Sequence, residues 1–144
     1  MLNFMKGSIF SRNQSKFVPD EPEQDVQVLA VWGSPGSGKT TVSVRLAKYL
    51  ADRKRNVVLL LCDMTTPMLP CICPPAELEC ERSLGSILAA THITDTLIKQ
   101  NCVTHKKMSY LTMIGMLKGE NVFTYPPYTQ ELAAELIDHL RDIA

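Results

Sequence analysis

Residues 33–40 of the chain read Gly-Ser-Pro-Gly-Ser-Gly-Lys-Thr, which matches the phosphate-binding pattern G-x-x-x-x-G-K-[ST]. Gly33 and Gly38 permit backbone angles that a Cβ would forbid, so that successive N–H groups can turn toward phosphate oxygens. A helix that follows such a loop aims the positive end of its dipole at the same anion. The stretch therefore predicts a nucleotide-binding loop, and ATP is the expected ligand.

Two side chains of this loop have predicted chemical roles. Lys39 supplies a mobile charge for the β and γ phosphates, and the Thr40 hydroxyl is placed to ligate a Mg²⁺ that bridges them. The predicted nucleotide-binding residues occupy the loop and the first helical turn after it: Gly33, Ser34, Pro35, Gly36, Ser37, Gly38, Lys39, Thr40 and Thr41.

The segments around the loop have the pattern that this motif requires. Val26–Val31 is apolar and predicts a strand, and Thr40–Arg53 predicts a helix because Val42, Leu46 and Leu50 recur at four-residue spacing. Val57–Cys62 is an uninterrupted apolar run, typical of a strand covered on both faces. Strand, loop, helix and parallel strand form a βαβ unit, expected to be right-handed.

Asp63 follows the second predicted strand directly. Ligand sites of open parallel sheets gather at the carboxyl ends of the strands, so Asp63 is a candidate for contact with Mg²⁺ or its water. The alternative is a solvated loop aspartate that caps the turn before Thr65. Lys39 and Asp63 are the predicted catalytic residues, and Thr40 and Asp63 the predicted metal ligands.

The remainder of the chain predicts further α/β structure. The segment 65–76 contains four prolines and predicts a loop. Beyond it we expect two short helices, a third strand and a closing helix with Thr129 as its N-cap, at 83–90, 94–100, 110–117 and 129–144. The prediction is a P-loop NTPase-type parallel sheet with flanking helices, an incomplete doubly wound sheet, in a domain over 26–144 that follows a polar tail or linker over 1–25.

Charge and hydropathy limit the partners. Fifteen basic and fifteen acidic residues cancel, so no overall field attracts nucleic acid or an anionic membrane. The short basic runs Arg53–Arg55 and Lys106–Lys107 are either a nucleic-acid contact or solvated flanks of strands, and their shortness favours the solvated flanks. No apolar run approaches the roughly 20 residues that span a bilayer, so we expect no transmembrane segment.

The chain has five cysteines, an odd number that favours free thiols in a reducing compartment, and we expect a cytoplasmic protein. Cys71, Cys73 and Cys80 lie close together in the sequence, but their spacing is not that of a standard zinc site. They are either metal ligands or incidental thiols. The histidines show no spacing that indicates catalysis.

At this level the chain resembles the ParA/MinD-type P-loop ATPases of the SIMIBI class, in particular the CpaE/TadZ-like branch associated with pilus assembly. The resemblance lies in Val28–Thr41, in Asn56–Asp63 with Pro67 shortly after, and in Leu111–Leu117 before the closing helix. It implies an α/β fold, ATP with Mg²⁺, and nucleotide-dependent homodimerisation. Such a switch positions cargo such as DNA, division proteins or a pilus machine.

Three features depart from the family pattern. Asp63 matches the first acid of the family's D-x-D motif near Mg²⁺ and the attacking water, but the second acid is Thr65 here. Ser34 stands where the family has a signature lysine that reaches the partner's phosphates. The family's Walker B strand is expected after a helix such as the one ending at Ala144, so we expect this sequence to be part of a longer protein, with weak or no hydrolysis on its own.

Two other functions remain open on the sequence. The loop also resembles those of small-molecule and nucleotide kinases, although kinases use several lid arginines and only Arg82 and Arg141 follow Arg55. A nonhydrolysing interaction module that retains the loop structurally is the third hypothesis.

Overall fold

A computed structural model describes residues 27–73, 78 and 82–143 of the chain. The predicted tail over 1–25 and Cys80 lie outside these residues. In chain order the described elements are α1 (Lys39–Asp52), β1 (Val57–Leu60), α2 (Leu69–Ile72), α3 (Leu84–Leu88), α4 (Asp95–Asn101), β2 (Val103–Thr104), β3 (Leu111–Ile114) and α5 (Gln130–Ile143).

The described strands form a mixed sheet in the order β1-β3-β2. β1 pairs in parallel with β3, with Val57 opposite Leu111 and Leu60 opposite Ile114. β2 is antiparallel to β3, so the prediction of an all-parallel sheet is wrong at this edge. The physical reason is the connection, since residues 105–110 are too few for the crossover that a parallel pair requires.

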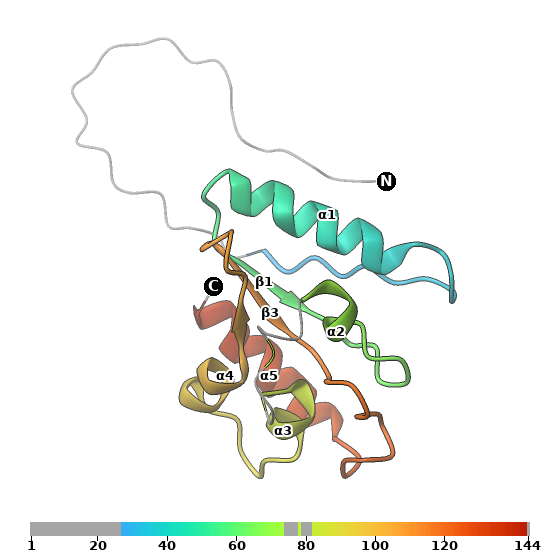
Figure 1. The fold of residues 1–144 in the computed structure, drawn as a ribbon. Helices are drawn as coiled ribbons and strands as arrows, with labels where there is room; N and C mark the ends of the chain where they lie inside the picture. The colour runs from blue at the N-terminus through green and yellow to red at the C-terminus, as the bar shows by residue number, and fades with distance from the viewer. Residues whose placement is uncertain (1–26, 74–77, 79–81, 144) are drawn as a thin grey trace, which may run out of the picture.

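Helices cover both faces of the sheet (Figure 1). Side chains alternate along a strand, so Leu111 and Met113 of β3 pack with Ala47 and Ala51 of α1, while Ile114 packs against the helices of the opposite face. Those three side chains of β3 have no exposed surface. The core is therefore two apolar layers separated by β3 and β1.

Helix α1 confirms the predicted helix within one residue at each end. It begins after Gly38 and ends at Asp52, and Lys54 then adopts a left-handed φ of 60° that turns the chain toward β1. The residues that α1 buries are Ala47 and Ala51, whose small side chains let the helix lie close to the strands.

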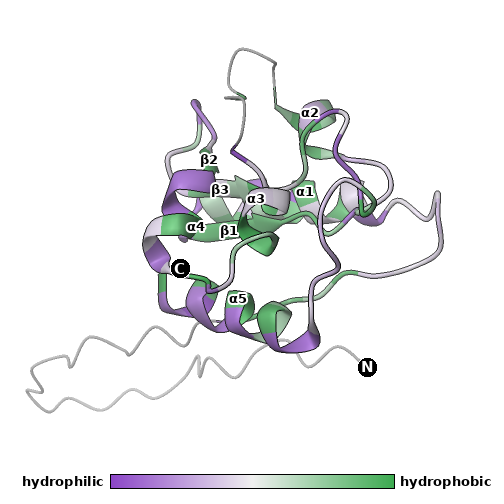
Figure 2. Ribbon diagram, turned by 90° about the horizontal axis from the view of Figure 1, so that it is seen from below, coloured by the Kyte–Doolittle hydropathy of each residue, from purple (hydrophilic) through white to green (hydrophobic). Residues whose placement is uncertain are grey.

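Helix α5 confirms the predicted closing helix. The Thr129 hydroxyl accepts a hydrogen bond from the Leu132 N–H at 3.2 Å, as an N-cap does. Hydrophobic residues gather on one side of α5 and hydrophilic residues on the other (Figure 2), and Leu136 and Leu140 are buried. His139 Nδ1 lies 2.7 Å from Asp95 Oδ1, which joins α5 to α4.

Three local predictions are wrong. Residues 27–31 belong to no strand, so the predicted βαβ unit lacks its first strand, and Val28 and Leu29 are 59% and 60% exposed. The short helix α2 lies inside the predicted loop, and β2 was missed. In each case pairing or packing with distant residues decides the outcome, and a local pattern does not carry that information.

Gly85 provides a test of the packing on the α3 side. A Cβ at this position would overlap the ring of Tyr125, which lies directly against the Gly85 backbone. We expect Gly85→Ala to lower the free energy of unfolding by about 1–3 kcal/mol through this clash, as measured by urea denaturation. In a Tyr125→Ala background the same substitution should instead stabilise, because alanine favours a helix over glycine by about 1 kcal/mol. Equal destabilisation in both backgrounds would contradict the proposed contact.

Candidate functional site

The predicted phosphate-binding loop is an exposed turn that leads directly into α1. The Ser37 N–H donates to the Ser34 carbonyl at 3.2 Å, which closes a turn over residues 34–37. Gly38 has φ 80° and ψ 10°, the left-handed conformation that glycine adopts without strain. A left-handed residue followed by a helical one turns neighbouring N–H groups to the same side, as in anion-binding nests.

Gly33 is required for a different reason. A Cβ at this position would lie 2.8 Å from Ser37 Oγ, closer than side chains approach one another. The loop therefore folds back on its own first residue. The first glycine of the motif permits this close approach, and the last supplies the positive φ.

The first turn of α1 presents unsatisfied donors beside this loop. No side chain caps the helix start, and the first turn contains no acidic residue. The first N–H groups of an α-helix have no partner within the helix, and the helix dipole places partial positive charge there. Together with the Lys39 ammonium, this makes the exposed start of α1 positively polarised, as anion-binding helix starts are.

Pairing of β1 with β3 brings Asp63 to the same place. The Leu61 N–H donates to the Ile114 carbonyl at 2.8 Å, so the pairing extends one residue past β1 and holds the chain just before Asp63. The Thr40 hydroxyl then donates to Asp63 Oδ2 across 3.5 Å. These oxygens come from residues 23 positions apart, and their proximity agrees with the predicted Thr40 and Asp63 pair.

The Thr40 and Asp63 oxygens fit a small hard cation. Neighbouring ligands of an octahedral Mg²⁺ lie about 3.0 Å apart, because each bond is about 2.1 Å long. The observed 3.5 Å separation is close to this value, and both groups are oxygen donors. Phosphate oxygens and water usually supply the remaining ligands of such an ion.

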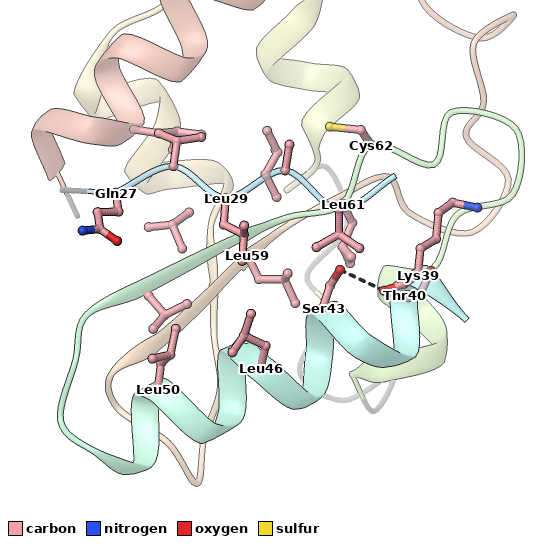
Figure 3. Close-up of a pocket in the computed structure, with 18 of the residues that line it drawn as sticks. Gln27, Leu29, Lys39, Thr40, Ser43, Leu46, Leu50, Leu59, Leu61 and Cys62 are labelled. Carbon is pink, nitrogen blue, oxygen red and sulfur yellow. Dashed lines mark hydrogen bonds between the residues drawn. The ribbon is translucent and has the colours of Figure 1, made fainter. Parts of the chain in front are cut away.

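A cavity of about 710 Å³ extends from this polar corner along β1. Lys39, Thr40 and Asp63 line one end, and the rest of its wall is largely apolar. Leu46 and Leu50 of α1 point toward Leu59 and the segment that begins at Gln27 (Figure 3). The predicted nucleotide-binding residues that border the cavity, Gly33, Lys39, Thr40 and Asp63, belong to the loop and the turn after β1, and Arg55 and Arg141 also line its wall.

The thiol of Cys62 lies between Leu61 and Asp63 and borders the same cavity. Burial raises the pKa of this thiol, and the negative charge of Asp63 raises it further. Both effects favour the neutral thiol, so Cys62 is a poor nucleophile near neutral pH.

Of the three clustered cysteines, the structure describes Cys71 and Cys73. Cys71 is exposed, whereas Cys73 is buried with its Sγ 3.8 Å from Met113 Sδ. Within the described ranges, no group of three or more His, Cys, Asp or Glu side chains is arranged to hold a metal ion. His139 pairs with Asp95, and His105 Nδ1 accepts a hydrogen bond from the N–H of Lys107, two residues later in the sequence.

A polar network around Tyr125 was not predicted from the sequence. The Tyr125 hydroxyl donates to Glu120, and the other carboxylate oxygen of Glu120 accepts from the Leu117 N–H at 2.7 Å, just past β3. Burial is the largest cause that raises the pKa of Tyr125, and the hydrogen bond to Glu120 is the second. No spacing or motif indicates this network, because it depends on the way residues 117–125 fold back over α3.

In the part of the chain that the structure describes, no helix combines the length and apolar character needed to cross a membrane. No protein-family model, curated protein or solved structure matches the chain. The functional assignment therefore depends on the geometry of the loop and of Asp63.

Alkylation of Cys62 reports the charge of Asp63. We expect Asp63→Asn to shift the pH at half-maximal iodoacetamide reaction of Cys62 downward, because loss of the neighbouring charge lowers the pKa of the thiol. The remaining burial should still keep this pH above that of free cysteine. Peptide mass spectrometry measures the alkylation rates of Cys62 and Cys102 in the same sample. Cys102 is the control, because only burial raises the pKa of its thiol. An unchanged Cys62 profile would show that Asp63 does not act on this thiol.

Proposed function

We propose that the chain binds Mg·ATP as a P-loop protein, through residues 33–41 and Asp63. The observation that carries the proposal is the meeting of three features at one corner. Gly38 is left-handed at the uncapped start of α1, Lys39 lies in the first turn, and Thr40 faces Asp63 at 3.5 Å. A chance glycine turn has no reason to combine an anion-binding helix start with an oxygen pair suited to a cation.

Each residue has a defined task in this proposal. The N–H groups of Gly36 and of residues 38–41 hold phosphate oxygens, and Lys39 neutralises their charge. Thr40 and Asp63 hold the cation, which when bound withdraws electron density from the phosphate that is transferred. Asp63 is also the candidate to orient the attacking water, since its carboxylate lies 3.5 Å from the Thr40 hydroxyl at the end of the loop.

The wider activity that we propose is a nucleotide-driven switch of ParA/MinD type, an ATPase within a P-loop NTPase domain. The resemblance of Val28–Thr41 and Asn56–Asp63 to that family supports it. Ser34 carries no charge that could reach the phosphates of a partner, so in this chain Lys39 and the cation balance the phosphate charge. A homodimer and a protein cargo are part of this proposal through the family resemblance alone.

Calorimetry tests the role of Lys39. We expect Lys39→Ala to weaken Mg·ATP binding about 10- to 100-fold, since a charged hydrogen bond contributes about 1.5–3 kcal/mol. Lys48→Ala is the matched control, because it removes the same charge from the same helix away from the loop. Equal affinity of wild-type protein and Lys39→Ala would contradict the assignment of the loop.

The Thr40 hydroxyl has a separate test. We expect Mg²⁺ to strengthen ATP binding to the wild-type protein, and Thr40→Val to remove most of this gain while leaving binding in EDTA unchanged. Thr40→Ser retains the hydroxyl and should keep the gain. The measurement is the ratio of Kd values with and without Mg²⁺. If valine and serine gave the same ratio, Thr40 would not be a ligand of the cation.

A further inference from the structure

Asp63 is held from both sides by one later stretch of the chain. Before it, the Leu61 N–H donates to the Ile114 carbonyl at 2.8 Å. After it, the Met64 carbonyl accepts a hydrogen bond from the Val122 N–H, also at 2.8 Å. Both partners belong to the end of β3 and to the segment that leads from it toward α5 in Figure 1. The place of Asp63 therefore depends on this segment as well as on β1.

One backbone hydrogen bond holds the chain just after Asp63. Residues 64–66 form a bend, and the two threonines in it are exposed. Among the described residues, no backbone hydrogen bond other than that from Val122 to Met64 reaches residues 62–67. The position of Asp63 is therefore sensitive to where the Val122 N–H lies.

Glu120 determines the shape of the segment that carries Val122. The Leu117 N–H donates to Glu120 Oε2 at 2.7 Å, and the Glu120 N–H donates back to the Leu117 carbonyl at 3.1 Å. These two bonds close a turn over residues 117–120, in which Gly119 has a left-handed φ of 90°. Glu120 thus closes the turn with its side chain and with its backbone, two residues before Val122.

The other carboxylate oxygen of Glu120 is attached to α3 through Tyr125. The Tyr125 hydroxyl donates to Glu120 Oε1 and lies 3.5 Å from Ser83 Oγ. Ser83 has no exposed surface, and its hydroxyl caps α3 by accepting from the Ser86 N–H. The ring of Tyr125 lies directly against the Gly85 backbone. The carboxylate is therefore held by α3 and not only by its own turn.

Buried polar contacts in turn hold α3 against the end of β3. The Leu84 N–H donates to the Gly115 carbonyl at 2.9 Å. The Ser83 N–H donates to the buried Asn101 Oδ1 at 3.1 Å, which joins α3 to α4. The end of β3 thus supports both α3 and the segment that contacts Met64.

We propose that Glu120 is a positioning residue for Asp63, which it holds opposite Thr40 through the contact of Val122 with Met64. This role rests on the proposed function, in which Asp63 is a ligand of the cation. Both carboxylate oxygens of Glu120 already accept hydrogen bonds from protein donors. Glu120 therefore acts through the backbone and is not itself a ligand of the cation.

The geometry of Mg²⁺ makes the position of Asp63 important. Mg²⁺ requires nearly ideal octahedral geometry with bonds of about 2.0–2.1 Å, so a displacement of Asp63 by about 1 Å would remove it as a ligand. The phosphate-binding N–H groups belong to the loop and the start of α1, which the segment after β3 does not hold. Loss of Glu120 should therefore affect the contribution of the cation and not the binding of the phosphates.

The ratio of ATP Kd values in EDTA and in Mg²⁺ tests this role on the full chain. We expect Glu120→Ala to reduce this ratio about tenfold, since loss of a group that orients a metal ligand typically weakens metal binding 10- to 100-fold. ATP binding in EDTA should stay unchanged. Glu120→Gln should keep the wild-type ratio, because its amide oxygen can still accept from the Leu117 N–H.

A control variant separates positioning from general loss of stability. Leu97→Ala shortens a side chain of α4 that packs against the same hydrophobic core, and we expect it to keep the wild-type ratio. The same reduction in Leu97→Ala would overturn the proposal. Equal ratios for Glu120→Ala and Glu120→Gln would overturn it too, because the hydrogen bond to Leu117 would then make no difference.

Amide hydrogen exchange without nucleotide, followed by NMR, distinguishes failure of this proposal from failure of the proposed function. We expect Glu120→Ala to speed exchange of the Val122 amide at least about tenfold, and Glu120→Gln to leave it unchanged. The amides of Leu111 and Met113 in β3 should keep their rates in both variants, which shows that the sheet is intact. Tyr125→Phe removes one bond to Glu120 but keeps the ring, so it should speed Val122 less, and it decides the question if Glu120→Ala does not fold.

The two measurements together assign each outcome. Unchanged exchange of Val122 in a folded Glu120→Ala, or in Tyr125→Phe where that variant decides, would overturn the positioning role whether or not ATP binds. Faster exchange of Val122 in a protein whose wild type does not bind Mg·ATP would support the contact with Met64 and contradict the proposed function alone.

Discussion

The parallel pairing of β1 with β3 is the interaction on which the rest of the described structure depends. β3 lies between the two apolar layers, and its residues Leu111, Met113 and Ile114 are fully buried at 0% exposure. Full burial of such a side chain contributes about 1.5–3 kcal/mol. Because β1 is held in register against β3, the chain keeps a fixed place as far as Leu61, whose N–H donates to the Ile114 carbonyl, and Asp63 follows two residues later. The loop and Asp63 thus meet because two hydrophobic strands pair.

The elements that the sequence predicted well are those whose own pattern determines them. Helix α1 follows from Leu46 and Leu50 at helical spacing, and α5 from its apolar face and the Thr129 cap. Residues 27–31 were predicted as a strand because they are apolar, but a strand also needs a neighbour to pair with. The antiparallel direction of β2 depends on the length of one connection, and its two residues give no periodic signal.

Part of the candidate region could also be predicted from the sequence, and part could not. The motif predicted the loop, and the left-handed φ of Gly38 at the start of α1 agrees with the role given to it. The proximity of Thr40 and Asp63 agrees with the rule that ligand sites of open parallel sheets lie at the carboxyl ends of the strands. The network of Tyr125 with Glu120 had no precedent in the sequence pattern, because it arises from the fold-back of residues 117–125. A phosphate-binding loop can be recognised in a sequence because backbone N–H groups contact the phosphates, and the glycines that allow this backbone conformation occur at fixed spacing. A network of ordinary polar side chains requires no residue at a fixed spacing.

The central claim is that residues 33–41 form a cradle for a polyphosphate, and a ¹⁵N NMR titration with three ligands tests it most directly. The account predicts that Mg·ATP and magnesium tripolyphosphate both shift the amide resonances of Gly36, Gly38, Lys39 and Thr40, and that adenosine does not. Because the N–H groups themselves are the proposed contacts, the largest shifts should fall on the loop and the first turn of α1. Absence of these shifts at millimolar Mg·ATP, or the same shifts with adenosine alone, would contradict the account.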